Sequence, residues 1–207
     1  FVVIGAGGSI GSSVSKTLHD QGAQLALLGR NSDSITEPPD HKNVIKLSVD
    51  ATNFEDVEKK ISIAADHFGH IDGVVNCVGS LLLKPAHLTT EEDLKNTIDT
   101  NLGSAFATVR AVAKVIKKDA SVILLSSSAA EVGIVNHEAI AAAKAAIIGL
   151  ARSAAATYAS RNLRFNCIAP GMVRTTLTAP ITQNEVALKG SVAMHALGRI
   201  GEPDEIG

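Results

Sequence analysis

A glycine-rich turn constrains this chain more than any other feature. The turn, Gly5-Ala-Gly-Gly-Ser-Ile-Gly11, directly follows the apolar run Phe1–Ile4. A short strand, a glycine-rich turn and a helix place backbone N–H groups and the positive end of the helix against a pyrophosphate. The alternative is a flexible glycine loop without a ligand. A Walker-type loop is disfavoured because Ser12 follows Gly11, where that motif requires lysine.

Strands and helices alternate along the rest of the chain. Apolar runs predict further strands over 24–28, 44–49, 74–78, 121–125 and 163–168. Helices are expected over 10–20, 54–68, 91–117 (bent near Gly103) and 136–159, with Asn136 as an N-cap. This alternation predicts an α/β fold, a doubly wound parallel sheet with helices on both faces. Ligands of such a sheet bind at the carboxyl ends of its strands.

Composition favours a single domain over residues 1–207. Hydrophobic residues make up 45% and charged residues 19%, which is typical of a globular chain. The irregular stretch 172–198 is the candidate for a lid over the substrate. A net charge of −2 gives no basic surface for nucleic acid. No apolar run is expected to be long enough to span a membrane. The chain opens within an apolar strand, so we expect residues ahead of Phe1.

The cysteines bear on the cellular compartment, and the histidines bear on whether the chain binds a metal. Cys77 and Cys167 form no disulfide framework, and no signal peptide is visible, so we expect a reducing, cytoplasmic setting. His67 and His70 flank Gly69 at a helix end, which does not predict a metal site.

The end of the second predicted strand bears on nucleotide choice. It reads Leu28-Gly29-Arg30, where an NAD site would carry an acid for the ribose 2′-OH. A small residue followed by arginine suits a 2′-phosphate, so we expect NADP(H) in preference to NAD(H). The alternative is a surface arginine on a turn.

Six further segments carry recognisable patterns. They are Val49-Asp50, Asn76-Cys-Val-Gly79, Thr100-Asn101-Leu102, Asn166-Cys-Ile-Ala-Pro-Gly171, Thr175 and Leu197-Gly-Arg-Ile-Gly-Glu-Pro203. With the Gly5–Gly11 turn, they make the chain resemble the short-chain dehydrogenase/reductase family in its small single-domain form, over essentially all 207 residues. Ser9 stands where that family usually has its middle glycine, and Gly8 offers an alternative spacing also seen in the family. The family's last strand is absent, which suggests a chain cut short.

The resemblance implies a Rossmann-type, three-layer α/β/α fold and a bound nicotinamide dinucleotide. It assigns to the cofactor Gly5, Gly7, Gly8, Ser9, Ile10, Gly11, Arg30, Asp50, Ala51, Asn76, Val78, Gly79, Lys144, Pro170, Gly171, Val173 and Thr175. Asp50 belongs to the pair that contacts adenine, and the segment from Asn166 to Thr175 holds the nicotinamide carboxamide.

The catalytic stretch departs from the family pattern at one position. The resemblance assigns Ser127 to the substrate carbonyl, Asn101 to a proton-relay water and Lys144 to the ribose hydroxyls. The family's tyrosine, which passes a proton to the substrate oxygen, falls at Ile140 when counted from either Ser127 or Lys144. Loss of a positioned acid costs roughly 10²–10⁴ in rate.

Two other side chains are considered as proton donors. Tyr158 is the only tyrosine and lies about 27 Å along the helix from position 140, at 1.5 Å per residue. His137 shares a helix stripe with Ile140 and Lys144 and titrates near neutrality, so we hypothesise that it supplies or relays the proton. The alternative is an exposed histidine at the start of a helix.

Two functions follow. The first is an oxidoreductase that moves hydride between NADP(H) and a carbonyl or alcohol substrate without the usual tyrosine. The second is a non-catalytic relative that binds NADP(H) and acts as a sensor, subunit or scaffold. The resemblance also implies a homodimer or homotetramer through the helices 101–117 and 136–159. Apolar residues in the stretch 172–198 indicate either an apolar substrate or packing of the lid on the core.

Overall fold

The computed structural model describes residues 1–36 and 43–207, and its described strands form one parallel sheet. The strands are β1 (Val2–Ile4), β2 (Leu25–Gly29), β3 (Val44–Ser48), β4 (Gly73–Asn76), β5 (Ala120–Leu125) and β6 (Leu163–Ile168). Their order is β3-β2-β1-β4-β5-β6, and every pairing between neighbours is parallel. The predicted doubly wound α/β fold is confirmed.

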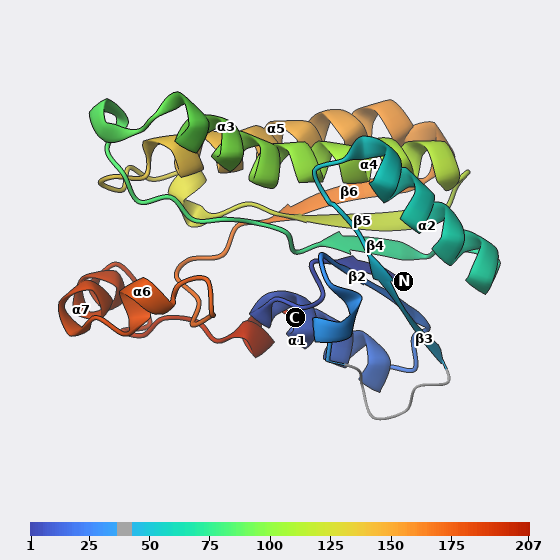
Figure 1. Cartoon of the computed structure of the whole chain (residues 1–207), viewed down its shortest axis with the longest axis horizontal. Coiled ribbons are helices and arrows are strands. Elements are labelled where there is room, and N and C mark those ends of the chain that lie inside the picture. Colours follow the sequence, from blue (N-terminus) through green and yellow to red (C-terminus); the bar gives the residue numbers. More distant parts are fainter. Residues whose placement is uncertain (37–42) are drawn as a thin grey trace.

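Helices cover both faces of this sheet (Figure 1). They are α1 (Ser9–Asp20), α2 (Phe54–Phe68), α3 (Glu91–Ile98), α4 (Ser104–Val115), α5 (Glu138–Tyr158), α6 (Ala179–Thr182) and α7 (Glu185–Ala193). Side chains alternate along a strand, so Val2 and Ile4 join the core beneath α2, α4 and α5. Val3 points the other way, into a smaller core against α1 with Leu25 and Leu27.

Three local expectations need correction or sharpening. The bend predicted near Gly103 is a π-helical turn over Asp99–Gly103, which separates α3 from α4. Asn136 does not cap α5. Its φ is 63°, a left-handed conformation that asparagine tolerates, and its carbonyl accepts a hydrogen bond from the Lys84 N–H. The N-cap is therefore His137. The stretch 172–198 is not wholly irregular, because it contains α6 and α7.

Helix α5 also corrects the expectation about apolar length. With the turn that follows it, Glu138–Arg161 is long and apolar enough, by length and composition, to cross a membrane. A core helix meets the same criterion, so this is weak evidence for a span. In this fold α5 packs on β5 and β6 and buries Ile147, Ala151 and Ala154 against the sheet.

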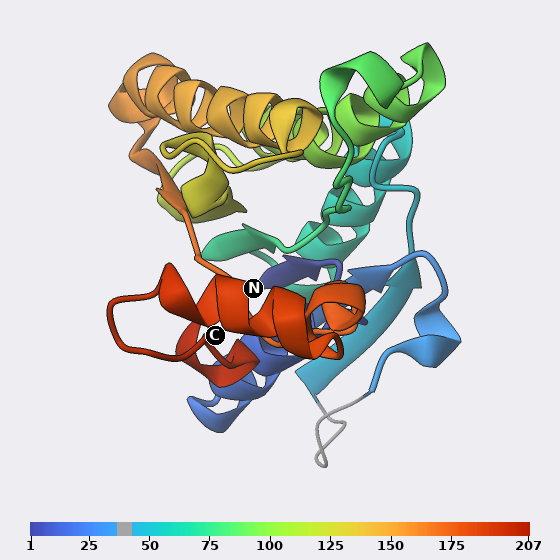
Figure 2. The ribbon, with the colours of Figure 1, turned by 90° about the vertical axis from the view of Figure 1, so that its left-hand side faces the viewer.

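The strand order reverses between β1 and β4. In open parallel sheets ligands bind at such a switch point, outside the carboxyl ends of the strands. Seen from that side, α6 and α7 lie across the front of the molecule (Figure 2). Residues 172–201, which contain the predicted lid 172–198 and are called the lid segment or lid from here on, close on themselves at their base. There Val173 bridges Gly201, and the Gly201 N–H bonds the Met172 carbonyl.

Candidate active site

The turn between β1 and α1 is built so tightly that two of its glycines have no room for a side chain. Gly5 has a φ of +83°, and a Cβ there would lie 3.0 Å from the backbone of Cys77 and Val78. A Cβ on Gly11 would lie 2.2 Å from the Gly5 carbonyl oxygen. The Gly5 and Ala6 N–H groups both bond the Leu28 carbonyl, which ties the turn to β2.

Helix α1 starts at this turn with its first N–H groups free of intrahelical partners. Gly8 is the N-cap residue and offers no side chain to satisfy them. Ser9 and Ile10 form the first positions of the helix, and a Cβ on Gly7 would make only ordinary contacts, at 3.9 Å from the Ser34 and Ile35 side chains. The arrangement leaves a positive helix end beside the switch point, which suits a pyrophosphate.

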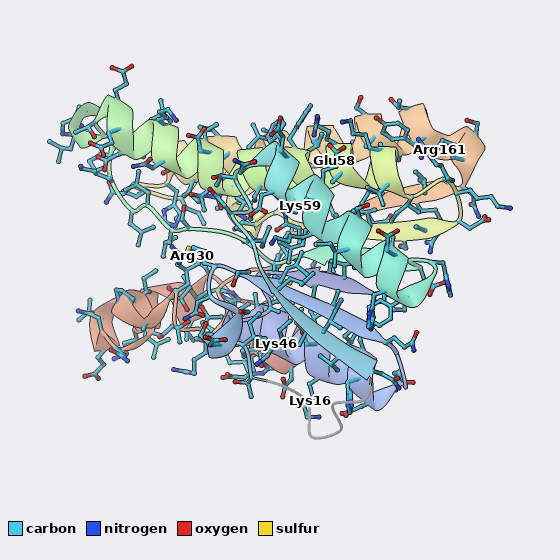
Figure 3. All side chains as sticks on the ribbon, turned by 45° about the vertical axis from the view of Figure 1, so that its right-hand side comes forward. Lys16, Arg30, Lys46, Glu58, Lys59 and Arg161 are labelled. Carbon is cyan, nitrogen blue, oxygen red and sulfur yellow. The ribbon has the colours of Figure 1, made fainter. Side chains whose placement is uncertain are left out.

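The residues expected to contact the adenosine follow β2 and β3. Arg30 directly follows β2 and is exposed, and Figure 3 labels it near the carboxyl end of the sheet. Asp50 and the buried Ala51 follow β3. The Thr52 hydroxyl donates to the Asp50 carboxylate over 2.7 Å, and this bond holds the pKa of Asp50 below its usual value.

Asn76, at the end of β4, is committed inside the protein. Its amide Nδ2 donates to the Thr108 hydroxyl over 2.9 Å, and its Oδ1 accepts from the Val78 N–H over 2.8 Å. The side chain is 3% exposed. Asn76 therefore holds the Val78-Gly79 loop at the switch point, and its side-chain amide already hydrogen-bonds Thr108 and Val78.

Asn101 lies in the π-helical turn and is the next link in this chain of contacts. Its Nδ2 donates to the Ser80 hydroxyl and to the Thr97 carbonyl, each over 2.9 Å. Its Oδ1 accepts from the Ser80 N–H over 3.2 Å. The side chain is 1% exposed, and through its two bonds to Ser80 it holds the segment after Gly79 in place.

Lys144 points from α5 into the same place. Its Nζ donates to the Leu125 carbonyl over 2.9 Å, at the end of β5. A Cβ on Gly79 would lie 3.4 Å from this Nζ and 3.2 Å from the Asn101 Oδ1. The Lys144 Nζ and the Asn101 Oδ1 therefore both lie beside Gly79. Burial lowers the pKa of Lys144 from 10.5 to about 8.

The structure distinguishes the serines after β5. The Ser126 hydroxyl is buried and donates to the Lys144 carbonyl over 2.7 Å, which ties β5 to α5. The Ser127 Oγ accepts from the Ala129 N–H over 3.2 Å, and this bond does not use the hydroxyl's own proton. Ser127 is partly exposed at the strand end, the position expected of the group that binds a carbonyl.

Ile140 lies one turn before Lys144 on the same face of α5. It is 3% exposed and packs into the protein. An isoleucine has no proton to donate, so the acid of the family pattern has no counterpart at this position.

The two alternative donors are both engaged elsewhere. The His137 Nδ1 lies 2.8 Å from the Val135 carbonyl, so it carries the ring proton and donates there. Tyr158 lies at the far end of α5 and packs against the Phe165 ring.

The segment that follows β6 enters the lid. The Pro170 carbonyl accepts from the Ser128 N–H over 2.9 Å, which sets this segment beside Ser127. Gly171 and Val173 follow, and the Thr175 hydroxyl lies 3.0 Å from that of Thr178. The Ser9 hydroxyl accepts from the Thr176 N–H over 3.2 Å, so the lid is also fastened to the start of α1.

His195 is a site residue that the sequence did not reveal. Its Nε2 accepts from the Met172 N–H over 3.0 Å, and its Nδ1 bonds the Ser191 carbonyl over 2.7 Å. A backbone N–H only donates and a carbonyl only accepts, so the ring is neutral with its proton on Nδ1. A Cβ on Gly171 would lie 2.6 Å from that Nε2. No motif signals a histidine that acts on backbone 23 residues earlier.

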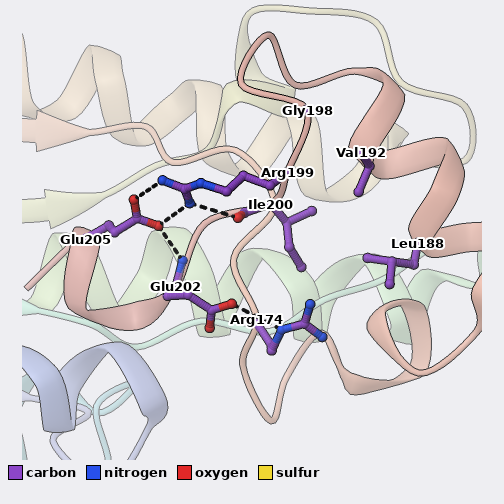
Figure 4. Close-up of a pocket in the computed structure, with 8 residues that line it drawn as sticks. All are labelled: Arg174, Leu188, Val192, Gly198, Arg199, Ile200, Glu202 and Glu205. Atoms are coloured by element: carbon purple, nitrogen blue, oxygen red, sulfur yellow. Dashed lines mark hydrogen bonds and ion pairs between the residues drawn. The ribbon is translucent and has the colours of Figure 1, made fainter.

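A separate pocket of about 500 Å³ lies inside the lid (Figure 4). Its apolar side is formed by Leu188, Val192 and Ile200, and ion pairs flank it, Arg174 with Glu202 and Arg199 with Glu205. None of the predicted catalytic residues lines it. The apolar side chains of α7 therefore serve, at least partly, to pack the lid on itself.

Known proteins resemble this chain over nearly its whole length. A family model described as enoyl-(acyl carrier protein) reductase matches residues 5–207. A 3-oxoacyl-[acyl-carrier-protein] reductase of Chlamydia muridarum is 33% identical over 219 residues, 99% of this chain and 85% of that protein. Carbonyl reductase family member 4 of Danio rerio is 31% identical over 213 residues, 99% and 86% of the two proteins.

Solved structures agree. The crystal structure of a short-chain dehydrogenase/reductase from Brucella melitensis matches with a TM-score of 0.89 and 27% identity. The match covers 99% of this chain and 84% of that one.

Proposed function

This chain belongs to the short-chain dehydrogenase/reductase family, an oxidoreductase family whose members bind NAD(P)(H), and from that premise we propose that it transfers hydride between NADP(H) and a carbonyl or alcohol without a catalytic tyrosine. The observation that carries the proposal is the β1–α1 turn. A Cβ on Gly11 would overlap the Gly5 carbonyl at 2.2 Å, so the turn admits only glycine there and brings bare backbone to the ligand.

The residues of the site suit a dinucleotide in the proposed position. The first N–H groups of α1 would hold the pyrophosphate, and Arg30 would pair with a 2′-phosphate at the ribose next to β2. Lys144 would hold the other ribose, and the Pro170–Thr175 segment would hold the carboxamide. When bound, the nicotinamide supplies or accepts the hydride.

At the reacting end, the chain would position the substrate beside the dinucleotide and supply a hydrogen-bond donor for its carbonyl oxygen. Ser127 donates a hydrogen bond to the substrate carbonyl oxygen, next to the end of β5. Holding the two reactants in contact lowers the barrier even without a strong acid, since well-oriented reactions reach large effective molarities. Ile140 keeps water away from one side of the reacting atoms because it is apolar and buried.

A second function is favoured by one observation, the isoleucine at position 140. A protein that binds NADP(H) tightly and transfers no hydride would act as a sensor, subunit or scaffold. It would keep the glycine turn and Arg30 and have no need of an acid.

The two functions separate in one experiment. NADPH and NADH are titrated into the wild type and Arg30→Ala, and turnover is then measured with a panel of ketones. The proposal expects NADPH to bind at least about tenfold more tightly than NADH, a preference of about 1.4 kcal/mol that Arg30→Ala removes. Binding without turnover of any ketone would establish the second function. Failure to bind either nucleotide would contradict both.

We also propose that the chain forms a homodimer or homotetramer. Helix α5 is apolar along its length, yet only 39% of its most apolar window is buried within one copy. A second copy packed on α4 and α5 would cover the remainder. Light scattering at micromolar concentration tests this, and a monomer would contradict it.

A further inference from the structure

Lys144 is the one charged side chain that is buried among the described residues, being 8% exposed. Burying an ionised ammonium costs several kcal/mol unless a carboxylate pairs with it. No ion pair to Lys144 occurs in the described part of the chain; its recorded hydrogen bond goes to the Leu125 carbonyl. An unpaired buried ammonium lowers the stability of the fold, which indicates that Lys144 has a role in the active site.

The geometry leaves the ammonium free to act on a ligand. It has three protons, and Leu125 takes one of them over 2.9 Å. Gly79 has no side chain to cover the Nζ, and a Cβ at that position would lie only 3.4 Å from it. The ammonium therefore lies at the carboxyl edge of the sheet, beside the end of β5 and the Gly79 backbone that follows β4.

Ile140 removes the group that would otherwise stand between Lys144 and the substrate. The two side chains lie one turn apart on the same face of α5. Isoleucine neither donates nor accepts a hydrogen bond, so it does not compete for the remaining ammonium protons. Ser127 is the other donor at this edge, and its hydroxyl holds the carbonyl oxygen without giving up its proton.

We propose that Lys144 is itself the proton donor of this active site. The inference deepens the proposed function and rests on it. In the reductive direction the substrate carbonyl carbon accepts hydride from the reduced dinucleotide. An Nζ–H bond breaks as the O–H bond of the alcohol forms, and the neutral amine regains its proton from water. In the reverse direction the neutral amine accepts the alcohol proton.

The surroundings of Lys144 suit this role. Burial lowers its pKa to about 8, so the ammonium gives up a proton near neutral pH far more readily than an exposed lysine. The titratable groups that face it are the thiols of Cys77, which directly follows β4, and of Cys167 on β6. Burial raises the pKa of both, that of Cys77 to about 12, so both stay uncharged in the working range.

The test is a pH profile of ketone reduction with saturating NADPH. The probes are 2,3-butanedione, acetophenone and an acetoacetyl thioester, and kcat is measured from pH 6 to 10. We expect wild-type kcat to be level below pH about 8 and to fall about tenfold per pH unit above it, because only the ammonium donates. A level profile across pH 7–10, or no turnover of any probe, would overturn the proposal. This measurement needs no variant.

A matched pair of variants separates proton donation from cofactor anchoring. Lys144→Arg keeps the positive charge and its donors for the ribose, but a guanidinium does not deprotonate in this range. We expect kcat to fall at least about 100-fold while the dissociation constant for NADPH changes less than tenfold. Lys59→Arg, at an exposed position on α2 labelled in Figure 3, is the control and should match the wild type.

The outcomes distinguish the two levels of the account. Lys144→Arg that binds NADPH and retains kcat within threefold of the wild type would overturn Lys144 as donor and leave the proposed function standing. A wild type that fails to bind NADPH would contradict the proposed function itself.

Discussion

The cofactor turn and the catalytic stretch are built from different parts of the chain. At the β1–α1 turn the working groups are backbone N–H groups, and Gly5 and Gly11 serve by having no side chain. At the reacting end the proposed working groups are the side chains of Ser127, held by the Ala129 N–H, and of Lys144, which bonds the Leu125 carbonyl at the end of β5. A backbone site tolerates many side chains around it but no added bulk, whereas a side-chain site depends on the identity of single residues.

Binding and chemistry should therefore be separable in this molecule. Changes at the turn should alter affinity for the dinucleotide, and changes in α5 should alter turnover. Substitutions in both regions test that division.

Gly11→Ala should damage binding most. Its Cβ would lie 2.2 Å from the Gly5 carbonyl oxygen and 2.9 Å from the Ala6 Cα, so the backbone of the turn must move. A strain of about 3 kcal/mol weakens NADPH binding roughly 200-fold, which a fluorescence titration measures. Gly149→Ala on α5, where a Cβ meets nothing within 4 Å, should bind as the wild type does. Equal affinity of Gly11→Ala and the wild type would break the assignment of the turn.

Ile140→Tyr should raise turnover without changing affinity. Supplying a phenol one turn before Lys144 restores a positioned acid, and we expect kcat to rise roughly 100-fold, the lower end for this kind of catalysis. Ile140→Phe is the control, because it adds the ring and its volume without the hydroxyl. If both variants gain equally, the effect comes from packing and the catalytic explanation is wrong.

Lys144→Met should stabilise the protein while it removes function. Burial lowers the pKa of Lys144 in the folded state from 10.5 to about 8, a cost of about 3 kcal/mol that is fully present below pH 8. Loss of the bond to Leu125 offsets about 1 kcal/mol, so the free energy of unfolding at pH 7 should rise by about 2 kcal/mol.

The stability gained by Lys144→Met should depend on pH. The advantage of Lys144→Met should shrink as pH rises from about 8 to 10.5, where the unfolded lysine also loses its proton. Urea unfolding at both pH values measures it, with Lys59→Met as the exposed control. A destabilised Lys144→Met at pH 7 would show that the ammonium is not a burden on the fold.

His195 should tune only the nicotinamide end. Asparagine at 195 retains a donor for the Ser191 carbonyl but loses the acceptor for the Met172 N–H, whereas glutamine places an acceptor near that N–H. We expect His195→Asn to weaken NADPH binding about tenfold and His195→Gln to recover most of it. Binding of 2′-phospho-ADP-ribose, which lacks nicotinamide, should be the same in all three proteins. An equal loss for that fragment would place the effect in general folding of the lid.

The parts that sequence predicts well are those encoded locally. The run of strands and helices follows from apolar spacing, and the ends of α2 and β6 agree with the expected residues. The glycine turn is also local, because its contacts join Gly5 to Gly11 and to the ends of neighbouring strands.

The parts that sequence misses depend on the whole fold. Ser9 meets Thr176, and His195 meets Met172, only because the lid folds back over the sheet. Helix α7 escaped prediction because Gly190 lies inside it, where glycine disfavours a helix. The commitment of Asn76 to Thr108 likewise requires α4 to pack against β4.

A calorimetric titration of the wild type with NADPH and with 2′-phospho-ADP-ribose tests directly whether the turn holds a dinucleotide. Both ligands should bind at one site per chain, with dissociation constants in the micromolar range or below. If neither ligand gives a heat of binding up to millimolar concentration, the assignment of the β1–α1 turn as a dinucleotide site is contradicted.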